Sequence, residues 1–292
     1  MRERIDKYLR HLLEKKRYSQ NTIAAYRNDL GQFVEWLEAE GRAGGSWASV
    51  TGQDIAAYLF FLREREYAPS TVARKMAAVK SFCHHLMDQE ELHEDPTEDV
   101  DTPKVKKYAP TALSDEDVRR LLAEPARLEN SKGLRDRAML EMLYGTGLRV
   151  SELVSLMLDD LDLERWLVRC GSGQNERVVP VSVRAMGALT AYLNHESGRA
   201  KLARNEEEHT LFLNLRGNQL TRQGLWLIIK HYVEQAGITQ EVTPHTLRHS
   251  FAIHHLRNSA GQQSEKLAEL KELLGHANIS TTQVYLQEQA IH

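Results

Sequence analysis

Residues 243–256, which read TPHTLRHSFAIHHL, place two histidines and an arginine within one helical turn directly after a proline. The leading threonine is a suitable helix N-cap and the proline suits the first helical position, so unpaired backbone N–H groups lie beside His245, Arg248 and His249. A helix N-terminus with basic side chains attracts anions. The stretch therefore predicts an anion site at the start of a helix.

A metal ion is the alternative ligand. His245 and His249 are four residues apart, as in the zinc motif H-E-x-x-H, but a threonine stands where that motif carries its glutamate base. Arg248 lies between them and would repel a cation. The metalloenzyme alternative stays open, and metal analysis of the purified protein would decide it. Its candidate ligands are His245, His249, His254 and His255.

Two further segments carry side chains that suit phosphate chemistry. In GTGLRVSEL, Arg149 follows a glycine-broken helix and Glu152 stands three residues later, a spacing that an ordinary surface ion pair would also explain. In LLGHANISTTQVY, His276 follows a helix-ending glycine, and the STT run can cap a short helix that carries Tyr285. Each feature alone has an ordinary structural explanation, and only their occurrence together argues for function.

The composition is that of a globular protein whose overall charge does not indicate a nucleic-acid partner. Of 292 residues 41% are hydrophobic, enough for packed cores, and no apolar run approaches the roughly 18 residues of a membrane span. The charged N-terminus lacks the apolar stretch of a secretory signal. Only Cys83 and Cys170 are present, which suits a reducing compartment, so we expect a cytoplasmic protein. With a net charge of −3, any basic DNA-binding surface must be local.

The first hundred residues predict a helical domain without strands. Apolar residues recur there at three- and four-residue spacing, in helices predicted at 5–13, 22–37, 55–65 and 72–87. An aperiodic stretch with three prolines, a run of acids and a run of lysines follows, which is typical of an exposed linker. We therefore expect an N-terminal domain at 1–103 and a linker at 104–112.

Residues 113–292 predict a second domain, mostly helical with a small antiparallel sheet. Ser114 can cap a helix, and the next helix is closed by Gly145 and Gly147. Between residues 166 and 183, alternating apolar residues flank a glycine-containing turn, which predicts a β-hairpin. Helices return from residue 185 onward. The expected fold class is therefore mainly α.

Read in chain order, GTGLRVSEL, the hairpin with its glycine turn, TPHTLRHSFA and LLGHANISTTQVY closely resemble the tyrosine recombinases, the phage-integrase family, and within it the Xer branch. YSQNTIAAYRNDLGQFVEWL and STVARKMAAVKSFCHHL are similar to that family's helical, SAM-like core-binding domain. The resemblance thus covers nearly the whole chain. It implies a core-binding domain followed by a recombinase catalytic domain.

The resemblance implies site-specific recombination, as in DNA integration or chromosome dimer resolution, without a metal or other cofactor. A tyrosine attacks a DNA phosphodiester and leaves a 3'-phosphotyrosine and a free 5'-hydroxyl, and a second strand reverses the step. Tyr285 would be the nucleophile. Arg149, Arg248 and His276 would donate to the phosphate oxygens. His245 would be the acid–base partner near Tyr285, and the supporting residues would be Glu152 and His249.

One position departs from the family pattern. The family typically carries a lysine in the hairpin turn, within G-K-G, where it protonates the leaving 5'-oxygen, but this chain has Gly171, Ser172 and Gly173. Serine is not a strong general acid. Another group delivers the proton, or the enzyme is slow, or the serine was introduced to slow it. The alternative function is therefore a DNA-binding relative of the recombinases with impaired cleavage.

The resemblance also implies a partner, double-stranded DNA with a short and roughly palindromic site. The protein would act as a homo- or hetero-tetramer on two such sites. Two N-terminal helices begin alike, in SQNTIAAYR and PSTVARK, each with a cation within two turns, so these cations could line one face. The expected DNA contacts are Arg27, Arg74, Lys75 and Lys80, with Arg177 in the hairpin.

Overall fold

The computed structural model describes residues 1–292 apart from 17, 101–111, 206, 258–262, 277 and 290–292. The chain divides into two compact units, Met1–Tyr108 and Ala109–His292, each with a hydrophobic core of its own. Most of the expected linker lies outside the described residues, so its boundaries stay a prediction.

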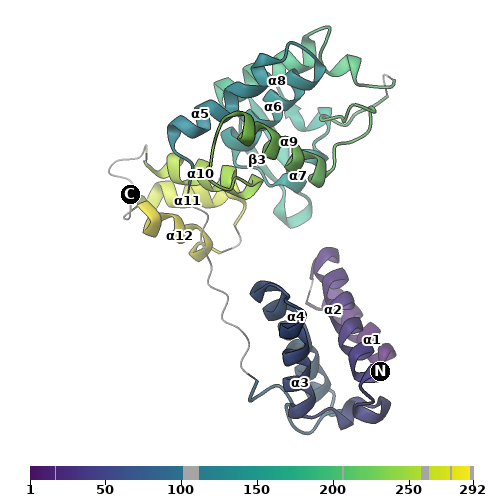
Figure 1. The fold of residues 1–292 in the computed structure, drawn as a ribbon. Coiled ribbons are helices and arrows are strands. Elements are labelled where there is room, and N and C mark those ends of the chain that lie inside the picture. Colours follow the sequence, from purple (N-terminus) through teal and green to yellow (C-terminus); the bar gives the residue numbers. More distant parts are fainter. Residues whose placement is uncertain (17, 101–111, 206, 258–262, 277, 290–292) are drawn as a thin grey trace. The chain divides into compact units, whose positions relative to one another are not determined.

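Four helices build the described part of the N-terminal unit, as the sequence predicted (Figure 1). Ser19 caps the second helix by accepting from the Thr22 N–H, and Thr51 and Asp54 form a reciprocal capping box at the start of the third. A proline opens the fourth. The helices are α1 (Arg2–Glu14), α2 (Gln20–Ala39), α3 (Gly52–Glu64) and α4 (Pro69–Asp88), with 3-10 turns η1 (Ala43–Gly45) and η2 (Trp47–Ser49) after α2.

Aromatic side chains from all four helices fill the centre of this unit. Tyr8, Phe33, Tyr58 and Phe82 are fully buried, and the ring centroids of Phe33 and Tyr58 lie 4.7 Å apart. Trp47, in the η2 turn, reaches the ring of Phe82 at 4.7 Å. Because each ring buries a large apolar area, these contacts hold the four helices as one packed unit.

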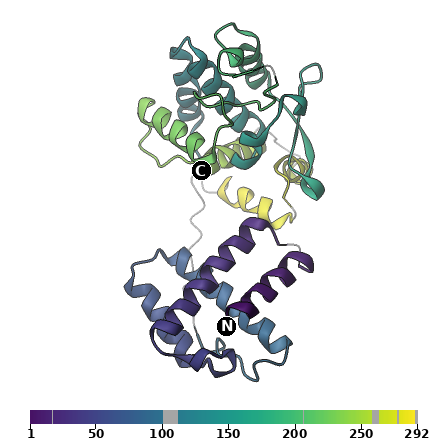
Figure 2. The same cartoon turned by 90° about the vertical axis from the view of Figure 1, so that its right-hand side faces the viewer.

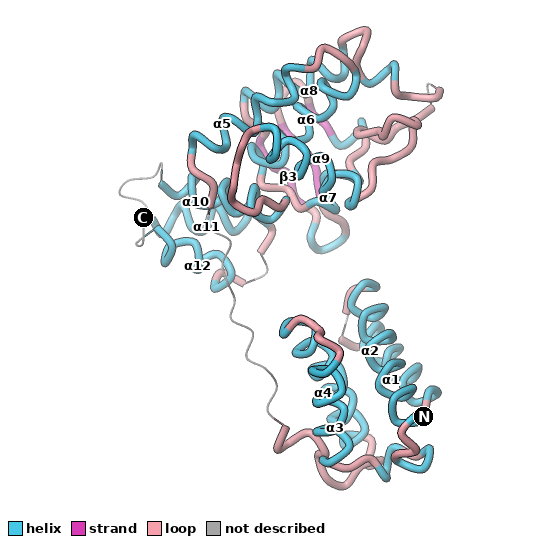
Figure 3. Tube along the Cα trace, viewed as in Figure 1, coloured by secondary structure: helices cyan, strands magenta, loops and turns pink. Residues whose placement is uncertain are grey.

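The C-terminal unit is mostly helical with a small antiparallel sheet, which confirms the predicted fold class (Figure 3). The predicted hairpin is present, with Leu167 paired to Pro180 and Cys170 to Arg177. A third strand of two residues was not predicted, because it is too short to show alternation. The strands are β1 (Leu161–Asp162), β2 (Leu167–Cys170) and β3 (Arg177–Pro180), in that order across the sheet. The helices are α5 (Asp115–Ala123), α6 (Ser131–Thr146), α7 (Val150–Ser155), α8 (Val183–Asn194), α9 (Arg222–Gln235), α10 (Pro244–Arg257), α11 (Gln263–Leu274) and α12 (Ser280–Gln289), with 3-10 turns η3 (Glu124–Arg127), η4 (Leu158–Asp160), η5 (Gly173–Asn175) and η6 (Arg199–Lys201).

Helix α6 is buried along most of its length and packs against α8 and α10. One detail differs from the prediction, because Gly145 lies within this helix. A Cβ there would approach Ser182 Oγ to 2.7 Å, so the glycine permits close packing at the start of α8. The helix ends at Gly147, whose φ of +62° is the left-handed conformation that favours glycine. This sharp end places Arg149 at the N-cap of α7.

Helices α10, α11 and α12 share a small hydrophobic cluster separate from the main core. Leu256 of α10 packs with Leu270 and Leu274 of α11, and the ring of Tyr285 on α12 packs against them. Figures 1 and 2 show α11 and α12 beside α10. The helix that carries Tyr285 therefore rests on α10 and α11. No helix within the described parts of the chain is long and apolar enough to cross a membrane.

Candidate active site

The C-terminal unit brings together residues for which the sequence predicted phosphate chemistry. They come from the α6–α7 junction, strand β3, the first half of α10 and the segment from the end of α11 into α12. Hydrogen bonds and ring contacts join them into one cluster, hereafter the active-site cluster. Its members are Arg149, Glu152, Arg177, Arg248, His249, His276 and Tyr285.

Glu152 is the buried centre of the cationic side of this cluster. Its carboxylate accepts from both Nη atoms of Arg177, at 2.7 and 2.9 Å, and from the backbone N–H and Nη1 of Arg149, at 2.7 and 2.9 Å. Burial alone would raise the pKa of Glu152, but the hydrogen bonds from Arg177 and Arg149 lower it to about 2. The carboxylate is therefore ionised at neutral pH and holds two guanidinium groups in place.

Arg177 supports the site in a way that the sequence did not indicate. Its largely buried guanidinium also donates from Nε to the Leu273 carbonyl at 2.8 Å. Gly275 passes so close that a Cβ there would lie 3.0 Å from Arg177 Nη1. Arg177 thus ties strand β3 to Glu152 and to the end of α11. Its expected DNA contact stays a prediction.

Arg248 is buried on α10, and among the described residues no carboxylate pairs with it. Its Nη1 donates to the Gly147 carbonyl at 2.5 Å and its Nη2 to the Leu274 carbonyl at 2.6 Å. These carbonyls end α6 and α11, where the helix dipoles concentrate partial negative charge. Burial, followed by the nearby Arg149, lowers the pKa of Arg248 to about 10, so the guanidinium stays cationic at neutral pH.

Tyr285 and His276 complete the cluster. The ring centroid of Tyr285 lies 5.1 Å from that of His249 and 6.3 Å from that of His276. His276 Nε2 is 3.2 Å from Arg248 Nη2. Burial, and then the charges of Arg248 and Arg149, lower the pKa of His276 to about 4, so its imidazole is neutral at neutral pH.

His245 lies in the first turn of α10 with an exposed side chain. Residues three and four apart share a helix face, so its spacing puts it on the face of Arg248 and His249. Thr246 N–H donates to Thr243 Oγ1 at 3.2 Å, which confirms the predicted N-cap before this helix. The acid–base role of His245 stays a prediction.

The cluster carries a surplus of positive charge. Among the described residues, the guanidinium groups of Arg149, Arg177 and Arg248 have one carboxylate near them, that of Glu152, which leaves two positive charges. Burial raises the pKa of the neighbouring Cys170 thiol to about 11, so it adds no negative charge. Guanidinium groups bind phosphate oxygens in charge-assisted hydrogen bonds, so this surplus suits a phosphodiester.

The tip of the β2–β3 hairpin is exposed and carries Ser172. Gly171 has a φ of +89°, and a Cβ there would lie 2.2 Å from the Asn175 carbonyl oxygen, so this turn requires glycine. No lysine occurs between Lys132 and Lys201 in the sequence. The hairpin therefore offers no ammonium group to a leaving oxygen.

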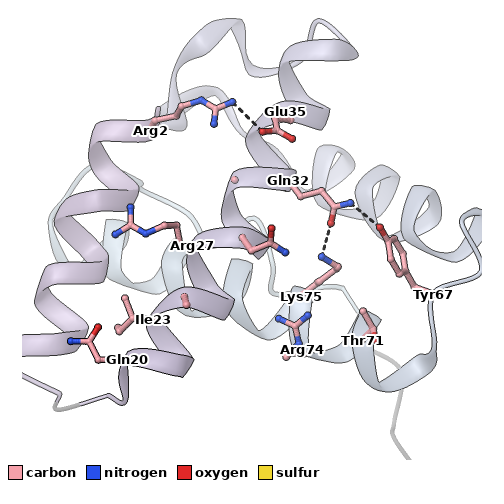
Figure 4. A pocket seen from close by; sticks show the side chains of 13 residues that line it. Arg2, Gln20, Ile23, Arg27, Gln32, Glu35, Tyr67, Thr71, Arg74 and Lys75 are labelled. Atoms are coloured by element: carbon pink, nitrogen blue, oxygen red, sulfur yellow. Dashed lines mark hydrogen bonds and ion pairs between the residues drawn. The ribbon is translucent and has the colours of Figure 1, made fainter. Parts of the chain in front are cut away.

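Three of the expected N-terminal DNA contacts line one hollow of about 890 Å³ on the N-terminal unit (Figure 4). Arg74 and Lys75 both pair with the fully buried Asp29. Lys75 is itself buried and donates from Nζ to Gln32 Oε1 at 2.5 Å. The three contacts are Arg27, Arg74 and Lys75, whereas Lys80 borders a second hollow with several acidic side chains. DNA contact by each of these residues stays a prediction.

Within the described parts of the chain, no group of three or more His, Cys, Asp or Glu side chains is arranged to hold a metal ion. The four histidines of the metal alternative have different surroundings. His254 Nδ1 lies 2.8 Å from the Tyr144 hydroxyl, and His255 Nε2 lies 3.7 Å from a carboxylate oxygen of Glu269. His249 instead faces the ring of Tyr285.

The chain is similar to known proteins in both sequence and fold. Residues 111–292 match the phage integrase family, and residues 5–90 match the phage integrase N-terminal SAM-like domain. The chain is 50% identical over 288 residues to tyrosine recombinase XerC of Roseiflexus castenholzii, covering 98% of this chain and 88% of that protein. It is 42% identical over 287 residues to tyrosine recombinase XerD of Listeria innocua, covering 98% and 94%.

A solved structure shares the fold. The XerH site-specific recombinase bound to a palindromic difH substrate, in a post-cleavage complex, matches with a TM-score of 0.72. The match covers 100% of this chain and 83% of that one at 20% identity.

Proposed function

Because this chain belongs to the phage integrase family and is an Xer-type tyrosine recombinase, an enzyme of DNA strand exchange, we propose that it cuts and rejoins DNA at the active-site cluster. The observation that carries this proposal is the convergence of the cluster. Arg149 donates to the Gly275 carbonyl across 126 positions of sequence, next to His276, and Tyr285 lies beside that histidine. A nucleophile and a surplus of positive charge therefore meet at one place.

Tyr285 is the proposed nucleophile. Its oxygen loses the phenol proton and attacks phosphorus in a DNA phosphodiester, while the bond to the 5'-oxygen breaks. The products are a 3'-phosphotyrosine and, after proton uptake, a free 5'-hydroxyl. Attack by the 5'-hydroxyl of the partner strand restores a phosphodiester and frees the tyrosine. The position of the Tyr285 ring beside His249 and His276 supports this assignment.

Arg149, Arg248 and His276 are the proposed donors to the non-bridging phosphate oxygens. Arg149 is held by Glu152 and Arg248 by two helix-end carbonyls, so both are oriented before DNA arrives. Removing one such donor costs other enzymes roughly 100- to 1000-fold in rate. His245 is the proposed acceptor of the tyrosine proton, because its exposed imidazole stands one turn from Arg248.

A second candidate function is DNA binding with impaired cleavage. Ser172 favours it, because the exposed hairpin tip lacks the lysine that typically supplies the leaving-group proton in this family. The two candidates differ in one observable, the amount of covalent protein–DNA intermediate formed by a chain that binds DNA tightly.

Members of this family bind DNA, and we propose that this chain binds a short, roughly palindromic duplex site. The hollow with Arg27 and Arg74 supports a contact from the N-terminal unit. Assembly as a homo- or hetero-tetramer on two sites is part of the same proposal. The XerH complex on a palindromic difH substrate supports the choice of site, since that protein shares this fold.

A covalent trap tests the proposed function. Duplexes retained at a stated moderate salt concentration are first selected from a random pool, because affinity for DNA depends strongly on salt. A nicked version of the selected site should give an adduct that survives denaturation, with or without a metal chelator. Tyr285→Phe should bind the site with nearly unchanged affinity and give no adduct. Tight binding without any adduct from the unmodified chain would favour the second candidate function.

A further inference from the structure

Both ring nitrogens of His276 have partners within hydrogen-bond distance. Nε2 lies 3.2 Å from Arg248 Nη2, and Nδ1 lies 2.9 Å from Thr282 Oγ1. Thr282 is fully buried on α12. Thr282 lies three residues before the proposed nucleophile. The helix that carries Tyr285 therefore also holds the imidazole of His276.

These two contacts determine which nitrogen carries the hydrogen in the protein without DNA. A guanidinium has donors only, so Nε2 of His276 must accept from Arg248. A neutral imidazole has one N–H, which then lies on Nδ1 and donates to the oxygen of Thr282. The depressed pKa of His276 is consistent with a neutral ring.

The proposed reaction needs the opposite arrangement. To donate to a phosphate oxygen, His276 must carry a hydrogen on Nε2 once that oxygen has taken the place of Arg248. A ring that stays neutral then has a bare lone pair on Nδ1, and a buried acceptor without a donor is costly. A threonine hydroxyl can rotate and either accept or donate, so Thr282 can satisfy Nδ1 in both forms.

We propose that Thr282 is a positioning residue that allows His276 to exchange its two neutral tautomers. Its hydroxyl accepts from Nδ1 in the protein without DNA and donates to Nδ1 when a phosphate oxygen faces Nε2. The ring gives up its Nδ1 hydrogen and gains one at Nε2 by exchange with solvent, so its charge is unchanged. This inference rests on the proposed role of the active-site cluster in cleaving DNA.

Thr282→Val tests the inference, because valine keeps the shape of threonine and removes the hydroxyl. Single-turnover cleavage should fall about 10-fold, the effect expected from losing one hydrogen bond in the reacting complex. Thr282→Ser retains a hydroxyl and should stay within about 3-fold of the unmodified chain. Thr281→Val is the matched control, since it makes the same change at the exposed neighbouring residue. Equal rates for Thr282→Val and the unmodified chain would overturn the proposal.

A double-substitution cycle separates an effect through His276 from a general loss of packing. In a His276→Ala background, Thr282→Val should cause no further loss of cleavage, because the ring on which the hydroxyl acts is gone. A loss as large as in the unmodified background would mean that Thr282 only packs α12, and would contradict the proposal.

Nitrogen-15 NMR of the histidine ring gives a readout that does not depend on cleavage. The chain without DNA should show the Nδ1–H form of His276, and the Tyr285→Phe chain bound to its DNA site should show the Nε2–H form. With Thr282→Val added, the bound complex should not reach that form. An Nδ1–H form or a doubly protonated ring in the Tyr285→Phe complex would overturn the proposal. By contrast, failure of the unmodified chain to form any adduct would count against the proposed function itself.

Discussion

The hollow of the N-terminal unit and the active-site cluster share one arrangement of charges. At each, a buried carboxylate pairs with one buried cation and one partly exposed cation. The carboxylate that pairs with Arg74 and Lys75 of the hollow is Asp29, which is fully buried. The side chain of Lys75 is 4% exposed and that of Arg74 is 44% exposed, and both pair with Asp29. The buried lysine neutralises the carboxylate, so Arg74 is the cation of this pair that is available to a ligand.

The active-site cluster repeats this arrangement with two arginines on Glu152. Arg177 is 11% exposed and Arg149 is 37% exposed. It differs by one addition, the buried Arg248, which is held by backbone carbonyls. One carboxylate against two cations leaves one positive charge in the group around Asp29, whereas the active-site cluster has two. The smaller surplus suits a contact that only holds DNA, and the larger one suits negative charge that develops during reaction.

DNA cleavage also requires a proton for the leaving oxygen, whereas DNA binding at the hollow does not. The largest expected effect on the cleavage rate therefore concerns Ser172. If the leaving 5'-oxygen lacks an acid, its expulsion as an alkoxide limits the rate. DNA with sulfur at that bridging position should be cleaved at least about 100-fold faster than normal DNA, because a thiolate leaves without a proton.

Ser172→Lys should raise cleavage of normal DNA and shrink the advantage of the sulfur substrate. Ser172→Met is the control, since it lengthens the side chain without adding an ammonium group. Equal rates of the unmodified chain on oxygen and sulfur substrates would show that another group already supplies the proton.

The next effect distinguishes the two arginines on Glu152. We expect the partly exposed Arg149 to act on DNA and the buried Arg177 to stabilise the fold. Arg149→Ala should reduce single-turnover cleavage by about 100-fold, because it removes a proposed transition-state donor. Arg177→Ala should instead lower the free energy of unfolding by about 3–5 kcal/mol, because it leaves the buried Glu152 with one partner fewer. Denaturant unfolding and cleavage rates of both variants test this. A larger loss of stability from Arg149→Ala than from Arg177→Ala would break the comparison.

The pKa of Glu152, at about 2, predicts how stability depends on pH. A glutamate in an unfolded chain titrates near about 4.3, so the folded state favours the carboxylate. The resulting stabilisation, about 3 kcal/mol, is complete above about pH 4.3 and is lost as the pH falls towards 2. Glu152→Gln should remove this part of the acid dependence. Unfolding measured from pH 5 to 2 in both proteins tests it, and identical pH slopes would contradict the prediction.

The smallest effect concerns the hollow. Arg74→Ala should reduce the slope of log K against log salt by about 0.9, the value for one lost phosphate contact. Lys75→Met should leave that slope unchanged and lower the stability of the N-terminal unit, because it removes a buried partner of Asp29. Binding titrations over a range of salt concentrations distinguish the two variants. The reverse pattern would mean that Lys75, despite its burial, is the residue that contacts DNA.

Patterns local in the sequence predicted the helices and the hairpin, because apolar periodicity and glycine turns determine such elements over short stretches. The motifs likewise named most members of the active-site cluster. The sequence could not show which of two neighbouring cations is buried and which is exposed. Arg74 and Lys75 are neighbours on α4 and both pair with Asp29 on α2, 46 positions before Lys75, yet the fold buries Lys75 and leaves Arg74 partly exposed.

The supporting roles of Arg177 and Thr282 were not predicted for the same reason. Arg177 meets Glu152 across 25 positions and Leu273 across 96, so no local pattern indicated its place in the cluster. Thr282 read as part of a capping run, yet it lies buried against His276. Both roles follow from tertiary packing, which sequence periodicity does not encode.

Mass spectrometry of the trapped DNA adduct tests the central claim most directly. Trypsin cuts after Lys271, and Tyr285 is the only tyrosine among residues 272–292. After nuclease treatment, a 3'-linked nucleotide should be found on the peptide that follows Lys271, at Tyr285. A nucleotide linked instead to a peptide that contains Tyr26, Tyr144 or Tyr232 would contradict the assignment of Tyr285 as the nucleophile.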